Sequence, residues 1–282
     1  MQYLEPVDST HPAFGDLYDE LPLWSAPFGL LLLERVPMRL GLTILDVGAG
    51  TGFLTVELAQ RCGPQATVVA VDPWKAGMRR LQRKIEHLGI ENVRLIEHDA
   101  VELDLPDASI DVVVSNLGIN NFANADAVLR TCFRVTKPGG RLLLTTNLVG
   151  HMREFYDVYR ATLMELELAD RLATLDAHIN HRATLASVAA QLAHAGFELL
   201  AVTTDSCRMR FADGSSFLRH AFIRLAFLPA WMSVVLPEAV ERTFTVLERK
   251  LNAVAVERGK FALTIPIACI EACKPGTAEA LS

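Results

Sequence analysis

Three glycines at alternate positions follow a short apolar run in the segment Ile44–Gly52. Gly48, Gly50 and Gly52 have no Cβ, so the backbone can turn sharply here and approach a ligand closely. A phosphate-binding P-loop requires a lysine after its last glycine, and a dinucleotide loop requires the spacing G-x-G-x-x-G. Neither pattern is present, which leaves a glycine loop for another kind of ligand.

The charges around this loop indicate that ligand. No lysine or arginine occurs between Leu42 and Gln60, whereas Asp46 and Glu57 are acidic. An anionic loop favours a ligand that carries positive charge, such as an ammonium and a sulfonium group.

Two further acids follow apolar runs. Asp72 follows Val-Val-Ala-Val and can accept hydrogen bonds from both hydroxyls of a ribose. Asp99 and Ala100 follow the next run, and we expect the carboxylate to meet an exocyclic amine and the Ala100 amide a ring nitrogen. Trp74 either covers a flat base or packs against the protein. These residue types together predict a nucleoside site.

Short β-branched runs alternate with amphipathic segments from Thr43 to Thr146, as in a parallel sheet with helices on both faces. The predicted strands are Thr43–Val47, Thr67–Val71, Val93–Glu97, Ile110–Ser115, Arg141–Thr146, Phe197–Thr204 and Phe261–Cys273. The predicted helices are Pro27–Arg35, Phe53–Cys62, Lys75–Leu88, Ala125–Val135, Arg153–Leu168 and Thr184–Ala195. We interpret the basic residues of the Lys75–Leu88 helix as a solvated face.

The segment between the last two predicted strands, residues 205–260, carries apolar helical stretches at Ser216–Phe227 and Glu238–Val256. We expect an inserted cap here, within the same domain as a core of residues 40–204 and 261–274. Residues 1–39 are expected to form an N-terminal lid. The apolar stretch Phe222–Leu236 indicates either a hydrophobic acceptor or core packing.

Composition excludes several classes of protein. The 282 residues are 51% hydrophobic, and 27 basic against 33 acidic residues leave a net charge of −6, which disfavours nucleic acid as a partner. Five scattered cysteines and no recognisable leader predict a reduced, cytoplasmic protein. No apolar run is long enough for a membrane span. His178 and His181 have helical metal-ligand spacing, but no third ligand stands nearby, so we predict no metal.

The motifs in this order resemble the class I S-adenosylmethionine-dependent methyltransferases. The resemblance rests on D-V-G-A-G-T-G from Asp46, the acid Asp72, the pair Asp99-Ala100, D-V-V-V-S-N-L from Asp111, and V-T-K-P-G-G-R-L-L-L from Val135. It implies a Rossmann-like α/β fold with a seven-stranded, mostly parallel sheet whose last strand is antiparallel. It also implies a cofactor site, which we expect to comprise Tyr18, Asp46, Gly48, Ala49, Gly50, Gly52, Asp72, Pro73, Trp74, Asp99, Ala100, Asn116 and Leu117.

The remaining motifs are similar to a small-molecule branch of this family, which includes quinone methyltransferases and a carboxyl O-methyltransferase that acts on malonyl carrier protein. They are S-N-L-G from Ser115, T-T-N-L-V-G from Thr145, L-A-H-A-G-F from Leu192 and F-A-D-G-S-S-F-L-R from Phe211. We therefore expect methyl transfer, most simply to oxygen, on a small apolar or carrier-bound acyl acceptor. His151 and Asn121 are candidates for the catalytic group, and the oligomeric state stays open. The alternatives are a protein that binds the cofactor without turnover and a nicotinamide-dependent oxidoreductase.

Overall fold

A computed structural model describes residues 1–5, 7–8, 11, 13–19, 21, 23–180 and 182–276 and divides the chain into two compact units. Unit 1 consists of residues 1–11, 148–182 and 206–266. Unit 2 consists of residues 12–147, 183–205 and 267–282. In the described part of the chain, no helix is both long enough and apolar enough to cross a membrane.

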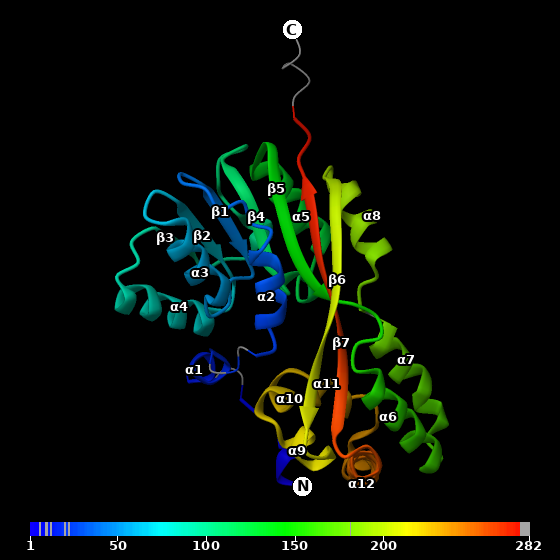
Figure 1. The fold of residues 1–282 in the computed structure, drawn as a ribbon. Coiled ribbons are helices and arrows are strands. Elements are labelled where there is room, and N and C mark those ends of the chain that lie inside the picture. The colour runs from blue at the N-terminus through cyan, green and yellow to red at the C-terminus, as the bar shows by residue number, and fades with distance from the viewer. Residues whose placement is uncertain are drawn as a thin grey trace. The chain divides into compact units, whose positions relative to one another are not determined.

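A seven-stranded sheet runs in the order β3-β2-β1-β4-β5-β7-β6 (Figure 1). Its strands are β1 (Thr43–Val47), β2 (Thr67–Val71), β3 (Val93–Ile96), β4 (Ile110–Asn116), β5 (Thr136–Asn147), β6 (Glu198–Phe211) and β7 (Phe261–Cys273). Strands β1 to β5 pair in parallel, and β7 is antiparallel to β5. The expected fold class and strand directions are confirmed.

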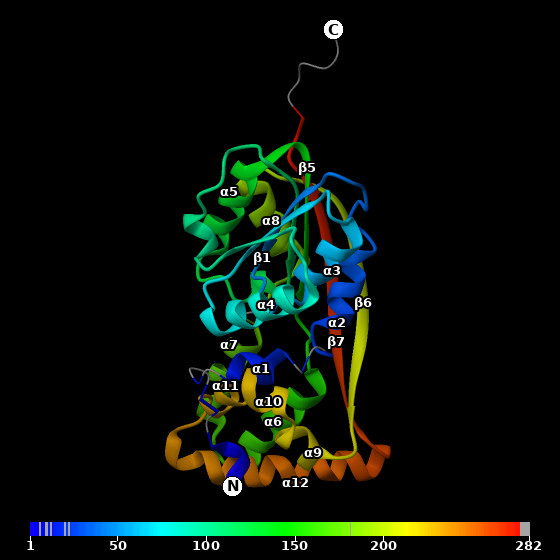
Figure 2. The ribbon, with the colours of Figure 1, turned by 90° about the vertical axis from the view of Figure 1, so that its left-hand side faces the viewer.

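Helices cover both faces of the sheet in unit 2 (Figure 2). The helices of this unit are α1 (Phe14–Asp19), α2 (Ala26–Leu33), α3 (Phe53–Cys62), α4 (Lys75–Leu88), α5 (Ala125–Val135) and α8 (Leu185–Ala195), with short 3-10 helices η2 (Ala100–Glu102) and η3 (Gly118–Asn120). Leu32 of α2 and Leu58 of α3 pack with Ile44 and Val68 of the sheet in one buried cluster. Because the inner strands of a parallel sheet are apolar on both faces, the sheet needs cover on both, and α5 and α8 lie on the opposite side from α2 and α3 (Figure 2).

Two strands are longer than the sequence predicts by several residues. β5 begins at Thr136 rather than Arg141, since Thr136 pairs with Ile110 across a register shift, so the Lys137–Gly140 turn signal lies inside the strand. β6 continues to Phe211 rather than ending at Thr204. It stands last in the strand order, and most of its residues are exposed, so its polar residues remain solvated in an extended strand. The strand therefore runs past Asp205, where we expected the insertion to begin, although the division into units also falls between Asp205 and Ser206.

Unit 1 is helical apart from the strand ends assigned to it. Its elements are η1 (Gln2–Leu4), α6 (Arg153–Glu165), η4 (Ala169–Arg171), α7 (Leu172–Asn180), α9 (Gly214–Arg219), α10 (Ala221–Ala226), α11 (Leu228–Met232), η5 (Pro237–Ala239) and α12 (Val240–Arg258). α6 ends before the expected Leu168 because Glu167 has a positive φ of 59°. The helix α7 was not among the predicted elements.

Aromatic side chains form the core of unit 1. The rings of Phe155 and Trp231 stack at 4.0 Å, and the hydroxyl of Tyr159 donates to the carbonyl of Trp231 at 2.8 Å. Phe222 and Phe227 are also buried and contact each other. The side chains of the apolar stretch Phe222–Leu236, which suggested a hydrophobic acceptor, are therefore largely buried in this core.

The units do not follow the expected domain boundaries of 1–39, 40–204 with 261–274, and 205–260. Residues 1–11 and 148–182 group with the insertion rather than with the lid and the core. That the insertion acts as a cap over a site stays a prediction.

Candidate functional site at the carboxyl ends of the first four strands

The glycine loop is attached to the carboxyl end of β2. The backbone amides of Gly48 and Ala49 donate to the carbonyl of Val71 at 2.9 and 3.2 Å. Gly48, Gly50 and Gly52 have φ values of 79°, 56° and 86°. All three lie in the left-handed region that favours glycine, which is why the loop needs this residue at alternate positions.

The three glycines differ in what a Cβ would meet. At Gly52 it would collide with Leu81 of α4, and at Gly48 it would lie 3.1 Å from the Cα of Gly118. At Gly50 no atom of the described chain lies within 4 Å. Gly48 and Gly52 are therefore needed for packing, whereas the free side of Gly50 can admit a ligand.

Asp72 closes the loop from the other side. One carboxylate oxygen accepts from the amide of Gly50 at 2.9 Å, and the other accepts from the amide of Trp74 at 2.7 Å. Burial raises the pKa of Asp72, and these two hydrogen bonds counter part of the increase. We expected this carboxylate to accept hydrogen bonds from both hydroxyls of a ribose. Each oxygen has a second lone pair, so it can still accept one ligand hydroxyl in addition to the backbone amide.

Trp74 packs against the N-terminal helix α1. Its ring meets Tyr18 edge-on at 5.3 Å and Phe14 at 5.9 Å. Burial raises the pKa of Tyr18, and the negative charge of Asp72 raises it further. Trp74 therefore packs against α1, its role of covering a base stays a prediction, and Pro73 beside it is exposed.

The basic side chains of α4 hold α1 in place. Arg80 donates to Asp19 at 2.8 Å, Lys84 contacts the same carboxylate, and Arg83 pairs with Asp16. Our interpretation of this face as merely solvated was wrong for these three residues. The sequence signal was present in the acids of Phe14–Asp19, but nothing in the pattern shows that the two helices pair.

Lys84 also connects α4 to the glycine loop. Its ammonium donates to the carbonyl of Thr51 at 2.9 Å. The loop thus receives a cation from a distant helix, although none occurs within its own sequence. Because Asp19 and Thr51 already satisfy this ammonium, it does not change the anionic character of the loop.

Asp46 lies at the end of β1 and is 1% exposed. It accepts a hydrogen bond of 2.6 Å from the hydroxyl of Thr55 on α3. Burial raises its pKa to about 7, against the lowering effect of Thr55. A cationic group nearby would stabilise the ionised form. Thr55 was not predicted as part of the site.

The third strand contributes Asp99 and Ala100. Asp99 is exposed, and one of its oxygens accepts from the amide of Val101 at 2.9 Å as the N-cap of η2. Ala100 is buried in this short helix. Asp99 therefore has a structural role that the sequence did not indicate, and any contact with an amine would involve the remaining capacity of its carboxylate.

Asn116 and Leu117 form the turn after β4. The side chain of Asn116 donates to the carbonyl of Ser25 at 3.2 Å and accepts from Thr145 at 2.7 Å. Leu117 has a positive φ of 64° and donates its amide to Thr145. Ser25 precedes α2, so Asn116 connects the N-terminal segment to the turn after β4.

The two candidate catalytic residues lie in different units. Asn121 is an exposed residue after η3 in unit 2, and its neighbour Asn120 bonds to Thr146 and Asn147. His151 is buried in unit 1, with its ring 5.5 Å from that of Phe227. His178 lies in unit 1, where its Nε2 atom is 3.2 Å from the hydroxyl oxygen of Tyr156, and His181 lies outside the described residues. Within the described ranges, no group of three potential ligands for a metal ion was found.

A family model described as a methyltransferase domain matches residues 39–194. Among curated proteins, the chain is 34% identical over 131 residues to the ubiquinone/menaquinone biosynthesis C-methyltransferase UbiE of Idiomarina loihiensis, a match covering 45% of this chain and 52% of that protein. The protein of the same name from Escherichia coli K12 is 32% identical over 126 residues, which cover 43% and 50% of the two chains. The matched region thus spans about half the length of these relatives.

Solved structures give the same fold at low identity. YcgJ from Bacillus subtilis has a TM-score of 0.60 at 16% identity and covers 89% of this chain and 99% of its own. A putative methyltransferase from Bacillus halodurans has a TM-score of 0.58 at 20% identity, covering 88% and 98%. At these identities the likeness shows the shared fold.

Proposed function

The chain belongs to the methyltransferase domain family and depends on S-adenosylmethionine, and on this premise we propose that it methylates a small, largely apolar phenol or hydroquinone. The observation that carries the cofactor site is the free side of Gly50, where a Cβ would meet no described atom within 4 Å. That side lies next to Asp72, whose carboxylate accepts from the Gly50 amide.

The residues around this point suit the cofactor's chemistry. The loop contains no cation of its own, and the one that reaches it, Lys84, is satisfied by Asp19 and Thr51. A diphosphate would lack a counter-charge there, whereas an ammonium or sulfonium would find the acids Asp46 and Asp72. This distinction is our reason for preferring an adenosyl sulfonium to a dinucleotide.

When bound, S-adenosylmethionine supplies an electrophilic methyl group on a sulfonium sulfur. We assign the methionine end to the loop Gly48–Gly52 with Asp46, the ribose to Asp72, and the adenine to the segment Asp99–Ala100. Pro73, Trp74, Asn116, Leu117 and Tyr18 complete the proposed site by supporting these contacts and limiting the access of water. The contribution of the chain is mainly to align the two reactants, since the leaving group is already activated.

The relatives name carbon as the methylated atom, whereas the sequence led us to expect oxygen. A phenolate is nucleophilic at its oxygen and at its ortho carbons, so one acceptor class accommodates both outcomes. The relatives match only about half of their own length and less than half of this chain. The acceptor and the atom are therefore proposals from chemistry and from the relatives' names.

A general base would take the phenolic proton. An imidazole is suited to this near neutral pH, and His151 is our candidate. Asn121 is the candidate for orienting the acceptor oxygen. A cytoplasmic location and the absence of nucleic-acid partners stay predictions from composition.

The test uses S-adenosylmethionine with a ¹³C-labelled methyl group and a panel of acceptors. The panel comprises substituted hydroquinones, a naphthol and a malonyl thioester on a carrier protein. Carbon-13 NMR of the product separates a methyl on carbon from a methyl on oxygen. Transfer to the phenols supports the proposal, and transfer to the malonyl carboxylate alone contradicts it in favour of an acyl acceptor.

Calorimetry with S-adenosylhomocysteine separates the remaining alternatives. Saturable binding without turnover on any acceptor would favour a binding protein of the same fold. Binding of a nicotinamide dinucleotide in place of S-adenosylhomocysteine would refute the cofactor assignment.

A further inference from the structure

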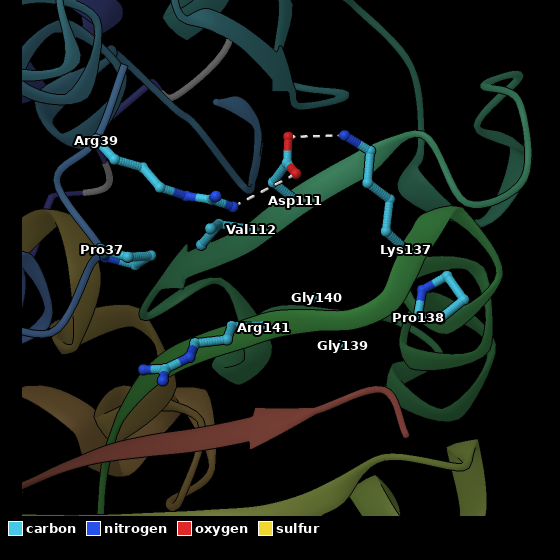
Figure 3. A pocket seen from close by; sticks show the side chains of 9 residues that line it. All are labelled: Pro37, Arg39, Asp111, Val112, Lys137, Pro138, Gly139, Gly140 and Arg141. Atoms are coloured by element: carbon cyan, nitrogen blue, oxygen red, sulfur yellow. Dashed lines mark ion pairs between the residues drawn. The ribbon is translucent and has the colours of Figure 1, made fainter. Parts of the chain in front are cut away.

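A cavity of about 300 Å³ lies in unit 2, away from the glycine loop (Figure 3). Asp111 at the start of β4 and Arg141 on β5 line it, together with Arg39, Lys137 and the glycine turn at Gly139. Arg141 pairs in register with Val112, near the amino end of β4. Because the glycine loop follows the carboxyl end of parallel β1, the cavity and the candidate cofactor site lie at opposite edges of the sheet.

Basic groups predominate around this cavity. Arg39, Lys137 and Arg141 provide three positive charges, and Asp111 provides the one negative charge among the lining residues. Outside the lining, Glu271 lies 3.8 Å from Arg141 but is also 3.4 Å from Arg35. Arg35 also lies 3.5 Å from Glu34, so this wider group of four cations and three acids has an excess of one positive charge, whereas the lining itself has an excess of two.

The single acid of the lining, Asp111, already has hydrogen-bond and ion-pair partners. Asp111 accepts from the amide of Thr43 and from the ammonium of Lys137, both at 2.9 Å, and the Arg39 guanidinium is 3.7 Å away. Burial raises the pKa of Asp111, but these donors outweigh burial and lower it. Figure 3 shows Arg39 and Lys137 reaching Asp111 from opposite sides. The carboxylate thus holds the two cations at the cavity without cancelling the charge.

The cationic heads remain accessible. The side chains of Arg39, Lys137 and Arg141 are 67%, 40% and 46% exposed. At Gly139, which has a φ of 75°, a Cβ would meet no described atom within 4 Å. The cavity can therefore admit a ligand at the turn, where the backbone has no side chain to fill the space.

We propose that this cavity binds the phosphate group of a small phosphate monoester. A dianion matches the two excess positive charges of the lining, and guanidinium groups match the geometry of phosphate oxygens. A volume of about 300 Å³ is at the lower end of small-molecule sites and leaves room for an organic part beside Pro37 and Val112. The site is independent of the methyl-transfer site.

The test is calorimetry of the full chain at about 0.15 M sodium chloride, a salt concentration that screens exposed charges. Inorganic phosphate and glycerol 3-phosphate serve as probes. We expect saturable binding of glycerol 3-phosphate, and binding of both probes with equal affinity would mean that the phosphate group alone is recognised. Absence of saturable binding for both probes would overturn the proposal.

Variants decide whether the binding occurs in this cavity. Arg39→Gln and Arg141→Gln should each weaken binding about tenfold, since each removes one charge-assisted contact. The matched control is Arg94→Gln, which removes an exposed charge on β3, outside the cavity. Equal weakening by the control and by Arg141→Gln would refute the site, and an unchanged melting temperature in each variant confirms that the fold is intact.

Discussion

Replacing Gly50 by alanine separates the ligand-binding role of the glycine loop from its folding role. Gly50 has a φ of 56°, and an added Cβ would meet no described atom within 4 Å. Alanine in the left-handed region costs about 1 kcal/mol of stability. In the absence of ligand, the variant should therefore lose only about this amount.

The variant should lose more free energy of cofactor binding than free energy of folding. If it occupies the free side of Gly50, the methyl group intrudes on a filled space, and overpacking of this kind costs about 1–3 kcal/mol. This range corresponds to a loss of affinity of about 5- to 150-fold. The assay is calorimetric titration with S-adenosylhomocysteine, together with urea unfolding of the ligand-free protein.

The matched control is Gly89→Ala at the end of α4. Gly89 has a φ of 63°, and it too has no atom near its Cβ position, so the backbone penalty is the same. It should lower stability by a similar amount and leave the affinity unchanged. Unchanged affinity in Gly50→Ala would refute the reasoning, because the free side of the loop would then face solvent rather than the cofactor.

Three further predictions concern the groups around the loop. Burial raises the pKa of Asp46 from 3.8 to about 7, so between these pH values the unfolded state holds fewer protons than the folded state, and the free energy of unfolding should fall as the pH rises. In urea unfolding at several pH values, Asp46→Asn should flatten this dependence, and an equal slope in the variant and the original protein would contradict it. Lys84→Met should leave the carboxylate of Asp19 with Arg80 as its remaining ion-pair partner among the described contacts, so α1 should be held less firmly. Limited proteolysis within residues 13–19 should then be faster, and an unchanged rate would show that Lys84 does not hold α1 in place. Gly77→Ala should destabilise the protein by about 1–3 kcal/mol despite the better helix propensity of alanine, because its Cβ would press on the ring of Trp74; a rise in the urea midpoint would show that the ring can move.

Local patterns were sufficient for most of the fold. β1, β2 and β7 have the predicted bounds because each is a continuous apolar or alternating run with clear ends. The pattern failed where a strand did not need burial. β6 carries polar residues in mid-strand and is exposed along most of its length, so its hydropathy resembles that of a loop.

For the site, the sequence determined which residue types follow which strands, and hence the glycine loop and the acids Asp46 and Asp72. Only the tertiary structure decided how these groups are engaged. It showed that Gly50 faces free space while Gly52 meets Leu81, that Asp72 accepts from the loop amide, and that Lys84 reaches the loop from α4. The physical reason is that periodicity and composition act over neighbouring residues, whereas free space, burial and the partners of a charge depend on segments distant in the chain.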